Sequence, residues 1–389
     1  MSEVTSNFPQ LRFPDFDDKW EEKRLSDIAE KSNVKNRDNE VSSVFTNSAT
    51  KGVVNQRDFF DKDIANQNNL DGYYIINHDN FVYNPRISFS APVGPLNRNH
   101  LGTGVMSPLY TILKINNVSL DFIERYFKTT KWHRYMNNIA NIGARHDRMN
   151  IISSDFMKMP IPLPKDEEQQ KIAAFLTAFD TKIEQLSKKQ ELLGEYKKGA
   201  MQQIFSQAIR FKADDGSDFP DWKEKKLGDI LDYEQPTNYI VDSTEYDNSF
   251  DMPVLTAGKS FILGYTNETH KVFENIPVII FDDFTTANKY VDFPFKVKSS
   301  AMKILKPKDS FVNIRLIFEF IQMLNFPIGE HKRYWISEYQ DLKIPFPSFE
   351  EQTKIASFLS SIDNKIEQVG KQLDESKQFK KALLQQMFV

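Results

Sequence analysis

Two stretches of the chain place apolar residues at a stride of seven, which is the pattern of a helix with a continuous apolar seam. In the first stretch, the seam consists of Ile172, Phe179, Leu186, Leu193 and Ala200. In the second, it consists of Ile355, Ile362, Val369 and Leu383, with a polar interruption at Ser376. Each stretch runs for about 40 residues without a proline, so the sequence predicts two helices of about 60 Å, each needing a partner for its seam.

Both predicted helices belong to an internal repeat. Residues 161–205 align without a gap to residues 344–388, at an offset of 183 and with 22 of 45 positions identical. A weaker match, at an offset of 202, relates the segment that starts at Trp20 to the one that starts at Trp222. The stretches between these anchors differ in length by 19 residues and share little sequence. The order is variable, constant, variable, constant, which is typical of a duplicated unit.

The repeat predicts four segments: a globular domain over 1–165, a helix over 166–209, a second domain over 210–348 and a second helix over 349–389. The second domain begins soon after the first helix ends, so it should lie at the far end of that helix. A second helix that packs on the first must then run back along it. We predict an antiparallel coiled coil with a domain at each end and pseudo-two-fold symmetry; the alternative is two ordinary amphipathic helices, each packed on its own domain.

Short runs of β-branched and aromatic residues, broken by Asn, Asp and Pro, occur in both variable domains. Residues 70–92 show this texture in the first domain, and Val278–Phe281 and Phe293–Ile304 show it in the second. Helical patterns around 123–138 and 312–324 alternate with these runs. The alternation predicts mixed α/β domains with a twisted sheet. The fold class expected for the whole chain is α+β, with two such domains separated by the two long helices.

Composition indicates a folded protein of near-neutral charge. Hydrophobic residues make up 40% of the chain and aromatic residues 13%, which supplies ample core. No apolar run reaches about 18 residues, no leader follows Met1 and cysteine is absent, so we expect a cytoplasmic protein without disulfides or thiolate metal sites. The net charge of −4 is unusual for a nucleic-acid binder, so such a function requires that the 50 basic residues be segregated or that partner chains contribute.

The sequence carries none of the common catalytic motifs. It lacks a Gly-x-x-x-x-Gly-Lys phosphate loop, a Gly-x-Gly-x-x-Gly loop, a His-Glu-x-x-His zinc motif and a Gly-x-Ser-x-Gly elbow. Asp282 and Asp283 resemble a magnesium pair, but without a companion Glu-x-Lys set a turn at a strand end is the preferred interpretation. Gly102-Thr103-Gly104 is also interpreted as a turn, and the six histidines show no metal-ligand spacing. We expect no catalytic residue, metal site or cofactor in this chain.

The junction between each variable domain and its helix has the most distinctive sequence. The first copy contains Gly143-Ala144-Arg145-His146-Asp147-Arg148, Ile161-Pro162-Leu163-Pro164 and Glu168-Gln169-Gln170-Lys171-Ile172-Ala173. The second copy contains Ile344-Pro345-Phe346-Pro347 and Glu351-Gln352-Thr353-Lys354-Ile355-Ala356. With the opening Trp and Leu-x-Asp-Ile pattern of both copies, these motifs resemble the target recognition domains of type I restriction-modification specificity subunits. The resemblance covers nearly the whole chain and departs at 329–334, where Gly-Glu-His-Lys-Arg-Tyr replaces the Gly-Ala-Arg motif.

This resemblance implies a division of labour between chains. Each variable domain reads one half of a split double-stranded DNA target, and the helices set the distance between the halves. Two modification subunits, which carry S-adenosylmethionine, methylate adenine, and restriction subunits bring translocation and cleavage that depend on ATP and magnesium. The chain itself is then a DNA-binding specificity subunit without catalytic activity of its own, in agreement with its lack of catalytic motifs.

The residues expected to contact DNA are polar and basic residues in turn-like positions of the variable domains. Phosphate contacts position a protein, whereas bidentate contacts of Arg, Asn or Gln to base edges specify sequence. The first candidates are Arg145, Arg148, Lys332, Arg333 and Tyr334. The further candidates are Lys51, Arg57, Arg86 and Arg98 in the first domain and Lys259, Thr285 and Lys289 in the second. For each of them, the alternative is an ordinary solvated surface residue.

Two other functions are compatible with parts of the sequence. A protein-interaction adaptor would display two domains on a rod without binding nucleic acid, so it would lack the steep salt dependence that phosphate contacts cause. A self-contained methyltransferase or nuclease needs an Asn-Pro-Pro-aromatic or Asp-Pro-Pro-aromatic motif with a cofactor loop, or a spaced acidic-Lys set, and the sequence has neither. Duplication without catalytic motifs favours binding over catalysis.

Overall fold

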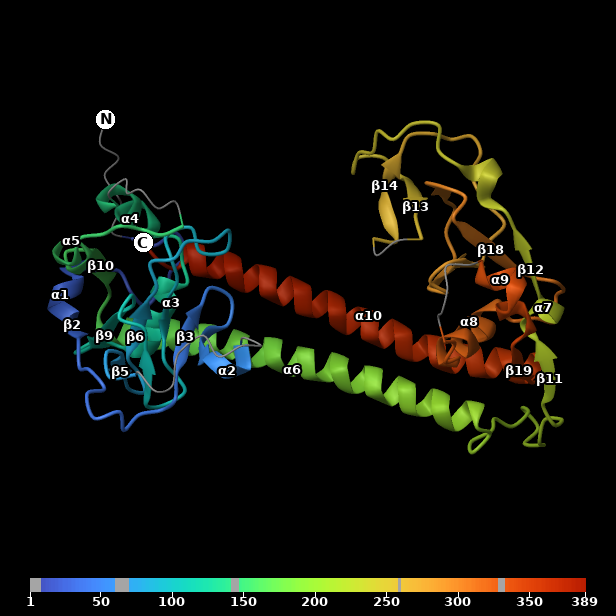
Figure 1. Ribbon diagram of the computed structural model, residues 1–389, viewed down its shortest axis with the longest axis horizontal. Helices are drawn as coiled ribbons and strands as arrows, with labels where there is room; N and C mark the ends of the chain where they lie inside the picture. The colour runs from blue at the N-terminus through green and yellow to red at the C-terminus, as the bar shows by residue number, and fades with distance from the viewer. Residues whose placement is uncertain (1–7, 60–69, 141–146, 258–259, 328–332) are drawn as a thin grey trace. The chain divides into compact units, whose positions relative to one another are not determined.

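The computed structural model describes residues 8–59, 70–140, 147–257, 260–327 and 333–389. The chain forms two compact units, one of Met1–Ser187 with Lys371–Val389 and one of Lys188–Gly370. Each unit combines one globular domain with parts of both long helices (Figure 1). The four segments predicted from the repeat have other boundaries than these two units, because each long helix is shared between the units. The division of the chain into two recognition domains and two spacer helices stays a prediction.

The long helices are α6 (Asp166–Phe205) and α10 (Phe349–Gln386), drawn in green and red in Figure 1. Both begin with acidic side chains, which lie at the positive end of the helix dipole and stabilise it. Their lengths of 40 and 38 residues confirm the helices predicted from the seven-residue stride. The mixed α+β fold class is confirmed as well, since each unit also contains a sheet.

In the first unit, a four-stranded antiparallel sheet has the order β2-β9-β6-β7. Its strands are β2 (Ala29–Ser32), β9 (Thr111–Ile115), β6 (Phe81–Tyr83) and β7 (Leu96–Arg98). The smaller pairs are β1 (Glu21–Arg24) with β10 (Pro160–Leu163), β3 (Phe45–Ser48) with β4 (Gly52–Asn55), and β5 (Tyr74–Ile76) with β8 (Gly104–Met106). The helices before α6 are α1 (Leu25–Ile28), α2 (Gln56–Phe59), α3 (Leu120–Phe127), α4 (His133–Ile139) and α5 (Ser153–Met157).

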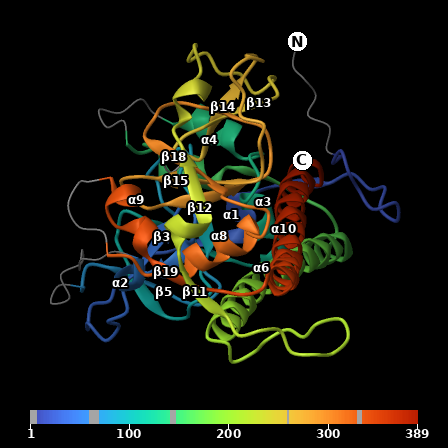
Figure 2. The same ribbon diagram turned by 90° about the vertical axis from the view of Figure 1, so that its right-hand side faces the viewer.

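The second unit repeats this design with the antiparallel order β12-β18-β15-β16, of which Figure 2 shows β12, β15 and β18 beside α8. These strands are β12 (Leu231–Glu234), β18 (Met302–Pro307), β15 (Val278–Asp282) and β16 (Asn288–Val291). The smaller sheets are β11 (Lys223–Lys226) with β19 (Lys343–Phe346), and β14 (Ile262–Thr266) with β13 (Met252–Leu255) and β17 (Lys296–Val297). The helical turns are α7 (Leu227–Ile230), η1 (Pro236–Tyr239), α8 (Ile314–Met323), α9 (Tyr334–Ser337) and η2 (Tyr339–Asp341).

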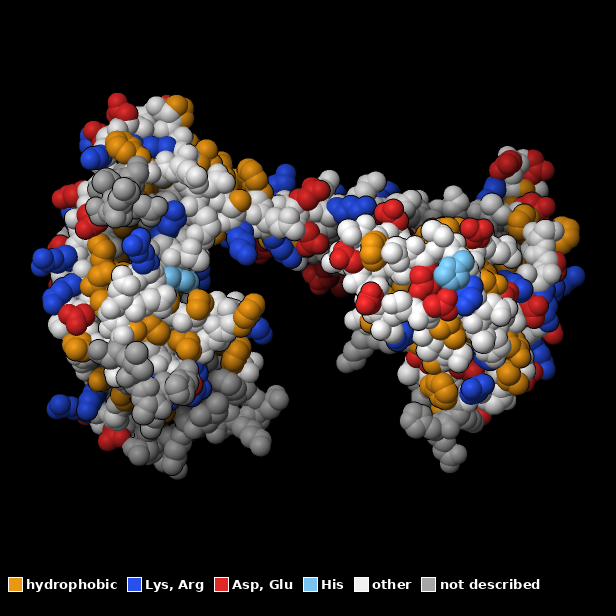
Figure 3. Space-filling model, turned by 90° about the horizontal axis from the view of Figure 1, so that it is seen from above, with side chains coloured by type: hydrophobic (Ala, Val, Ile, Leu, Met, Phe, Trp, Pro, Cys, Tyr) orange, Lys and Arg blue, Asp and Glu red, His pale blue; other side chains and the backbone are white. Residues whose placement is uncertain are grey.

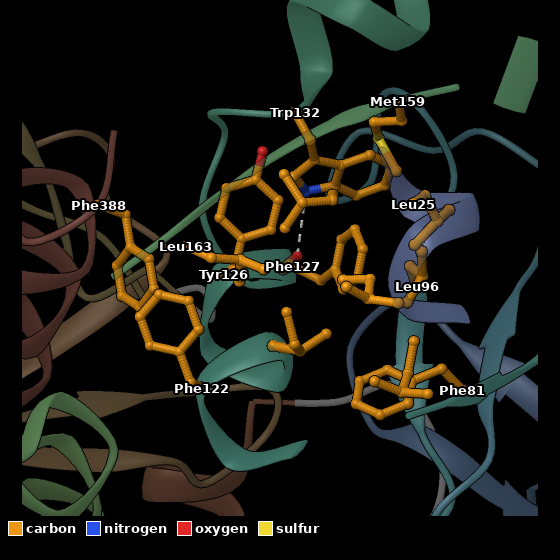
Figure 4. Packing of buried hydrophobic residues seen from close by; sticks show 14 of the residues in the cluster. Leu25, Phe81, Leu96, Phe122, Tyr126, Phe127, Trp132, Met159, Leu163 and Phe388 are labelled. Carbon is orange, nitrogen blue, oxygen red and sulfur yellow. Dashed lines mark hydrogen bonds between the residues drawn. The ribbon is translucent and has the colours of Figure 1, made fainter. Parts of the chain in front are cut away.

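The core of the first unit receives the end of α10. Phe388 lies 5.0 Å, between ring centroids, from Phe122 of α3 and 6.2 Å from Trp20, and all three rings are buried. Figure 4 shows Phe388 and Phe122 side by side in this cluster, with Tyr126 next to them. Burying a large side chain contributes about 1.5–3 kcal/mol. The last residues of the chain are therefore part of the first domain's core.

The core of the second unit receives the end of α6 in the same way. Phe205, which the repeat aligns with Phe388, stacks on Phe320 of α8 at 4.2 Å between ring centroids. Met201 and Ile204 are buried in the same cluster. Each domain is thus closed by the start of the helix that follows it and by the end of the helix of the other repeat.

Within each unit, α6 and α10 lie antiparallel. In the first unit, Phe179 contacts Phe379, while Ile172 packs in a cluster with Met387. In the second unit, Lys197 forms an ion pair with Asp363 at 2.8 Å, whereas residue 190 lies beside residue 370. The predicted antiparallel order is therefore observed in both units. A coiled coil that runs through both units and pseudo-two-fold symmetry stay predictions.

The duplicated Glu-Gln pair of the junction motif ties each domain to the start of its helix. Glu168 accepts two hydrogen bonds of 2.7 Å from Arg12, and Glu351 accepts bonds of 3.2 and 2.8 Å from Arg210. Glu351 also accepts a bond of 2.8 Å from the indole of Trp222. Both carboxylates are fully desolvated, and bidentate pairing with arginine offsets that cost.

The neighbouring glutamines, Gln169 and Gln352, hydrogen-bond to the N-cap residues of α3 and α8. The side chain of Gln169 accepts from the backbone N–H of Ser119, the N-cap of α3, and Gln352 accepts from that of Asn313, the N-cap of α8. Each amide also donates to the carbonyl of the second proline of its Ile-Pro-x-Pro motif. The Glu-Gln pair and the Ile-Pro-x-Pro element of the junction motif therefore form a structural joint between domain and helix.

We predict that Glu351→Gln lowers the free energy of unfolding of the second unit by about 3 kcal/mol, because Arg210 loses its buried counter-charge. Urea denaturation followed by tryptophan fluorescence measures this change. Glu350→Gln is the matched control, since Glu350 is exposed one residue earlier on the same helix and should cost less than about 0.5 kcal/mol. Equal effects of the two substitutions would contradict the role given to Glu351.

Candidate nucleic-acid interface

The first domain has a cleft of about 410 Å³ beside the edge hairpin β6–β7. Its walls come from β3, from α2, from the loop of residues 84–95 between β6 and β7, and from the closing segment of this domain, residues 147–149. The lining residues used below are Asn47, Ser48, Phe59, Asn84, Arg86, Ser88, Leu109 and Arg148. The cleft is thus built where two segments far apart in the sequence meet.

A network of asparagines holds the wall of the cleft. The Asn47 side chain donates 2.7 and 3.1 Å hydrogen bonds to the carbonyls of Val82 and Pro95, on either side of the β6–β7 loop. Asn84 donates to the Asn47 carbonyl and accepts from the backbone N–H of Arg86. Buried amides keep a fixed position only when they are satisfied in this way. The backbone that carries Arg86 is therefore held rigidly at the cleft.

Two arginines lie together on this rigid wall. Arg86 and Arg148 form an isolated antiparallel bridge, supported by a bond of 3.0 Å from Ile87 N–H to the Asp147 carbonyl. Asp147 lies 3.3 Å from Arg148 and 3.8 Å from Arg86. The hydrogen bond from Arg148 lowers the pKa of Asp147 below its ordinary value, so this carboxylate is ionised at neutral pH. It competes with any phosphate for both guanidinium groups.

The other candidates of the first domain have different surroundings. Lys51 is exposed and its ammonium lies 5.6 Å from the ring centroid of Phe59, which lines the cleft. Arg57 is exposed on α2. Arg98 is held by Asp79 at 2.7 Å and by Asp121 and Glu124. Three carboxylates satisfy its guanidinium, so we leave Arg98 out of the proposed surface. Arg145 lies outside the described residues.

In the second domain, the pair Asp282 and Asp283 forms a turn, as the sequence interpretation preferred. Asp282 accepts hydrogen bonds from the backbone N–H groups of Phe284 and Thr285, and Asp283 is buried beside Lys303 at 3.6 Å. Thr285 lies exposed in this turn, and Lys289 is exposed on β16. Asp282 is engaged by backbone donors and Asp283 by a lysine, so the pair is a poor magnesium site.

In the second domain, the closing segment is residues 333–337, and it shows that the expectation of a DNA contact by Tyr334 is wrong. Arg333 is exposed, but Tyr334 is only 1% exposed and packs in the core, so its side chain offers no surface to DNA. Its burial follows from the bond of 2.8 Å that its N–H donates to the Asp283 carbonyl, which draws the segment against the sheet. Lys259 and Lys332 lie outside the described residues.

The two domains place the same pair of elements together. In the first, the closing segment bonds to the β6–β7 loop through Asp147 and Met149; in the second, it bonds through Tyr334 to the loop of residues 283–287 between β15 and β16. These loops connect equivalent strands at the edge of equivalent sheets. We call each combination of loop and closing segment the loop pair of its domain. The sequence singled out Arg86 and Thr285 on these loops, but it did not indicate that the loops lie against the closing segments.

One group of potential metal ligands occurs in the second unit. Asp242, Glu268 and His270 bring ligand atoms within 4.8 Å of one another. Lys271 donates to Asp242 and, with His270, lowers its pKa to about 2, while the buried Lys296 pairs with Glu268 at 2.8 Å. Two ammonium groups already neutralise the carboxylates, so the group is an ion-pair cluster.

On the face shown in Figure 3, lysine and arginine side chains are interspersed with acidic ones in both units. The loop pairs carry local cations, since Arg86 and Arg148 in the first domain and Arg333 in the second lie on them.

The chain thus contains two domains of one design, and in each the closing segment lies against the loop of an edge hairpin. A family model described as "Type I restriction modification DNA specificity domain" matches residues 17–193 and 220–376. The chain therefore belongs to this family of type I restriction-modification specificity subunits and carries two copies of its DNA specificity domain. The family is one of binding subunits that need no cofactor, so the expectation of a non-catalytic DNA-recognition chain is confirmed at the family level.

Individual relatives agree with this assignment. The chain is 50% identical over 141 residues to the type I restriction enzyme EcoR124I/EcoR124II specificity subunit of Escherichia coli, an alignment that spans 35% of each chain. It is 26% identical over 312 residues to a putative type I restriction enzyme specificity subunit, MjaX, of Methanocaldococcus jannaschii, covering 70% of this chain and 67% of that one. A crystal structure of the type I S subunit from M. genitalium matches with a TM-score of 0.61 and 16% identity, over 98% and 99% of the two chains. The last match concerns the fold alone.

No helix in the described part of the chain has both the length and the apolar character needed to cross a membrane. This finding fits the sequence, in which even the two long helices carry charged residues throughout.

We predict that Asp147→Asn strengthens binding of duplex DNA about threefold, because Arg86 and Arg148 are freed for phosphate. Fluorescence anisotropy of labelled duplex at about 100 mM salt measures the dissociation constant. Asp155→Asn is the matched control, since Asp155 pairs with the exposed Lys158 at 3.0 Å and does not line the cleft. Weaker binding by Asp147→Asn would count against a DNA surface at this cleft.

Proposed function

We propose that this chain is the DNA-reading subunit of a type I restriction-modification complex, in which each domain binds one half of a bipartite target through its loop pair. The observation that carries the proposal is the recurrence of the loop pair at the same sheet edge in both domains. A local cationic element on a rigid edge hairpin is small enough to enter a groove, as base readout requires.

The two loop pairs differ in the residues that would contact DNA, at phosphates or at base edges. The first presents Arg86 and Arg148. The second presents Thr285 and Arg333, with Lys289 on the adjoining strand β16. Arginine pairs with guanine, whereas threonine is less selective. The halves of the target are therefore expected to have different sequences.

The proposal assigns the chemistry to partner chains. Two modification subunits with S-adenosylmethionine would methylate adenine, and restriction subunits with ATP and magnesium would translocate and cleave DNA. A solved structure from work on complex assembly of the type I system matches this chain with a TM-score of 0.52 over 95% of its length, which supports a fold suited to such assembly. The expected cytoplasmic location is kept, because the DNA target would lie there.

The adaptor function is disfavoured by the family to which the chain belongs. An adaptor needs no pair of arginines held on a rigid wall, and its edge loops have no reason to gather basic closing segments. Ordinary surface charges are also rarely fixed by a buried asparagine network such as that of Asn47 and Asn84. These features favour DNA, and a salt titration separates the two functions.

We predict that Arg86→Ala combined with Arg148→Ala weakens binding to the split target by about tenfold or more. Each lost phosphate contact should reduce the slope of log affinity against log salt by about 0.9. Anisotropy titrations at several salt concentrations give both quantities. Arg134→Ala, an exposed arginine of α4 that does not line the cleft, should leave them unchanged. Unchanged affinity in the double variant would exclude this loop pair as the DNA surface.

Exchange of single domains tests the bipartite target. Genome-wide mapping of methylated adenines in a host that carries this chain and its partners should give a split motif. Replacing one variable domain should change one half of that motif and leave the other half intact. A continuous motif, or no methylation that depends on this chain, would contradict the proposed function.

A further inference from the structure

We propose that Phe89 in the first domain, and Phe284 at the equivalent place in the second, insert against DNA bases and unstack a base step within each half-site. This inference rests on the proposed function and deepens it, because it names the side chains that would deform the bound DNA. Each ring lies on the loop of a loop pair, and the same loop pairs carry the cations that would position the phosphate backbone.

Phe89 is fully exposed, although it belongs to a firmly held turn. Ser88 N–H donates to the Ala91 carbonyl at 3.0 Å, and Ala91 N–H donates back to the Ser88 carbonyl at 3.1 Å and to the Ser88 hydroxyl at 3.2 Å. These three bonds fix the backbone on both sides of the ring. The turn therefore presents Phe89 to the outside at a defined position.

Two arginines lie on the same loop pair as Phe89. Arg86 lies three residues before it, and Arg148 bridges to Arg86 from the closing segment. Ser88 and Leu109 line the same cleft, and Leu109 is another exposed apolar side chain. Proteins unstack and kink DNA by inserting an apolar side chain between two bases while cationic side chains hold the neighbouring phosphates.

A single exposed phenylalanine is unremarkable on a protein surface, so the second domain is the independent observation. Phe284 is 36% exposed in the loop between β15 and β16, which corresponds to the loop of Phe89 between β6 and β7. Asp282 accepts from the backbone N–H of Phe284 and of Thr285, and Thr286 takes a left-handed φ of 57°. The two loops share neither length nor sequence, yet both hold a phenylalanine in a tight turn.

The chemistry of stacking explains why an aromatic ring would recur at loops that read different sequences. A phenyl ring stacks on any base, because every base has a π-face, and the contact is worth about 1–3 kcal/mol per base. Hydrogen bonds from the neighbouring polar residues then give the selectivity. The ring contributes affinity and deformation, and the step that unstacks most easily adds an indirect preference.

The test uses the full chain without partner subunits and a duplex that carries the target found by methylation mapping. 2-Aminopurine replaces each adenine in turn, since its fluorescence rises when it is unstacked. We expect a rise at one step of each half-site. Phe89→Ala should abolish the rise in one half only, and Phe284→Ala in the other half, with affinity reduced about tenfold to a hundredfold by Phe89→Ala.

Three further variants distinguish a stacking ring from a merely apolar contact. Phe89→Tyr keeps the ring and should keep the fluorescence rise, whereas Phe89→Leu keeps an apolar side chain and should lose it. Phe311→Ala is the matched control, because Phe311 is 68% exposed in the second unit and lies outside both loops. Circular dichroism confirms that each variant is folded.

The outcomes separate this inference from the function on which it rests. If the unaltered chain does not bind the duplex, the proposed function fails and the inference fails with it. If the unaltered chain binds with steep salt dependence but Phe89→Ala leaves affinity and fluorescence unchanged, the inference alone is overturned. A fluorescence rise that Phe89→Leu preserves would also overturn it.

Discussion

Each domain core is completed by side chains from two long-helix segments, one of them from the other repeat. The first domain packs on Leu176 of α6 and on Phe388, which follows α10, and the second packs on Leu359 of α10 and on Phe205 of α6. Neither domain can complete its core with its own residues alone. A loop pair is therefore held by a sheet whose stability depends on residues from both repeats of the chain.

Ion pairs between α6 and α10 favour one alignment of the two helices along each other. Asp180 pairs with Lys380 and with Arg125 of α3, and Asp363 pairs with Lys197 and with Arg315 of α8. The repeat offset of 183 relates Asp180 to Asp363 and Lys197 to Lys380, so these are two copies of one arrangement. Apolar seams tolerate a slip along the helix, whereas a partly buried pair that loses its partner is costly. The pairs thus favour one antiparallel register and attach each domain helix to it.

Much of the fold was accessible from the sequence because the repeat and the stride of seven are local properties of the chain. The starts of α6 and α10 at residues 166 and 349 followed from them, as did the mixed α+β class of the domains, whereas the helices end at Phe205 and Gln386, a few residues before the predicted bounds. The candidate site was less accessible. Arg148 and Arg86 were singled out separately, but nothing in the sequence placed them side by side. Arg98 was indistinguishable from a surface cation, and Tyr334 from an exposed aromatic residue, because burial depends on neighbours that are distant in the chain.

Spacing and residue identity along the chain were enough to identify the duplication, the two long helices and the family. Which duplicated residues are structural and which face outward depends instead on packing in three dimensions. Packing places Glu168 and Glu351 in the joint between domain and helix, and it places the loop that carries Phe89 against the segment of Arg148. Desolvation and pairing depend on what surrounds a side chain in space, and no local sequence pattern records those surroundings.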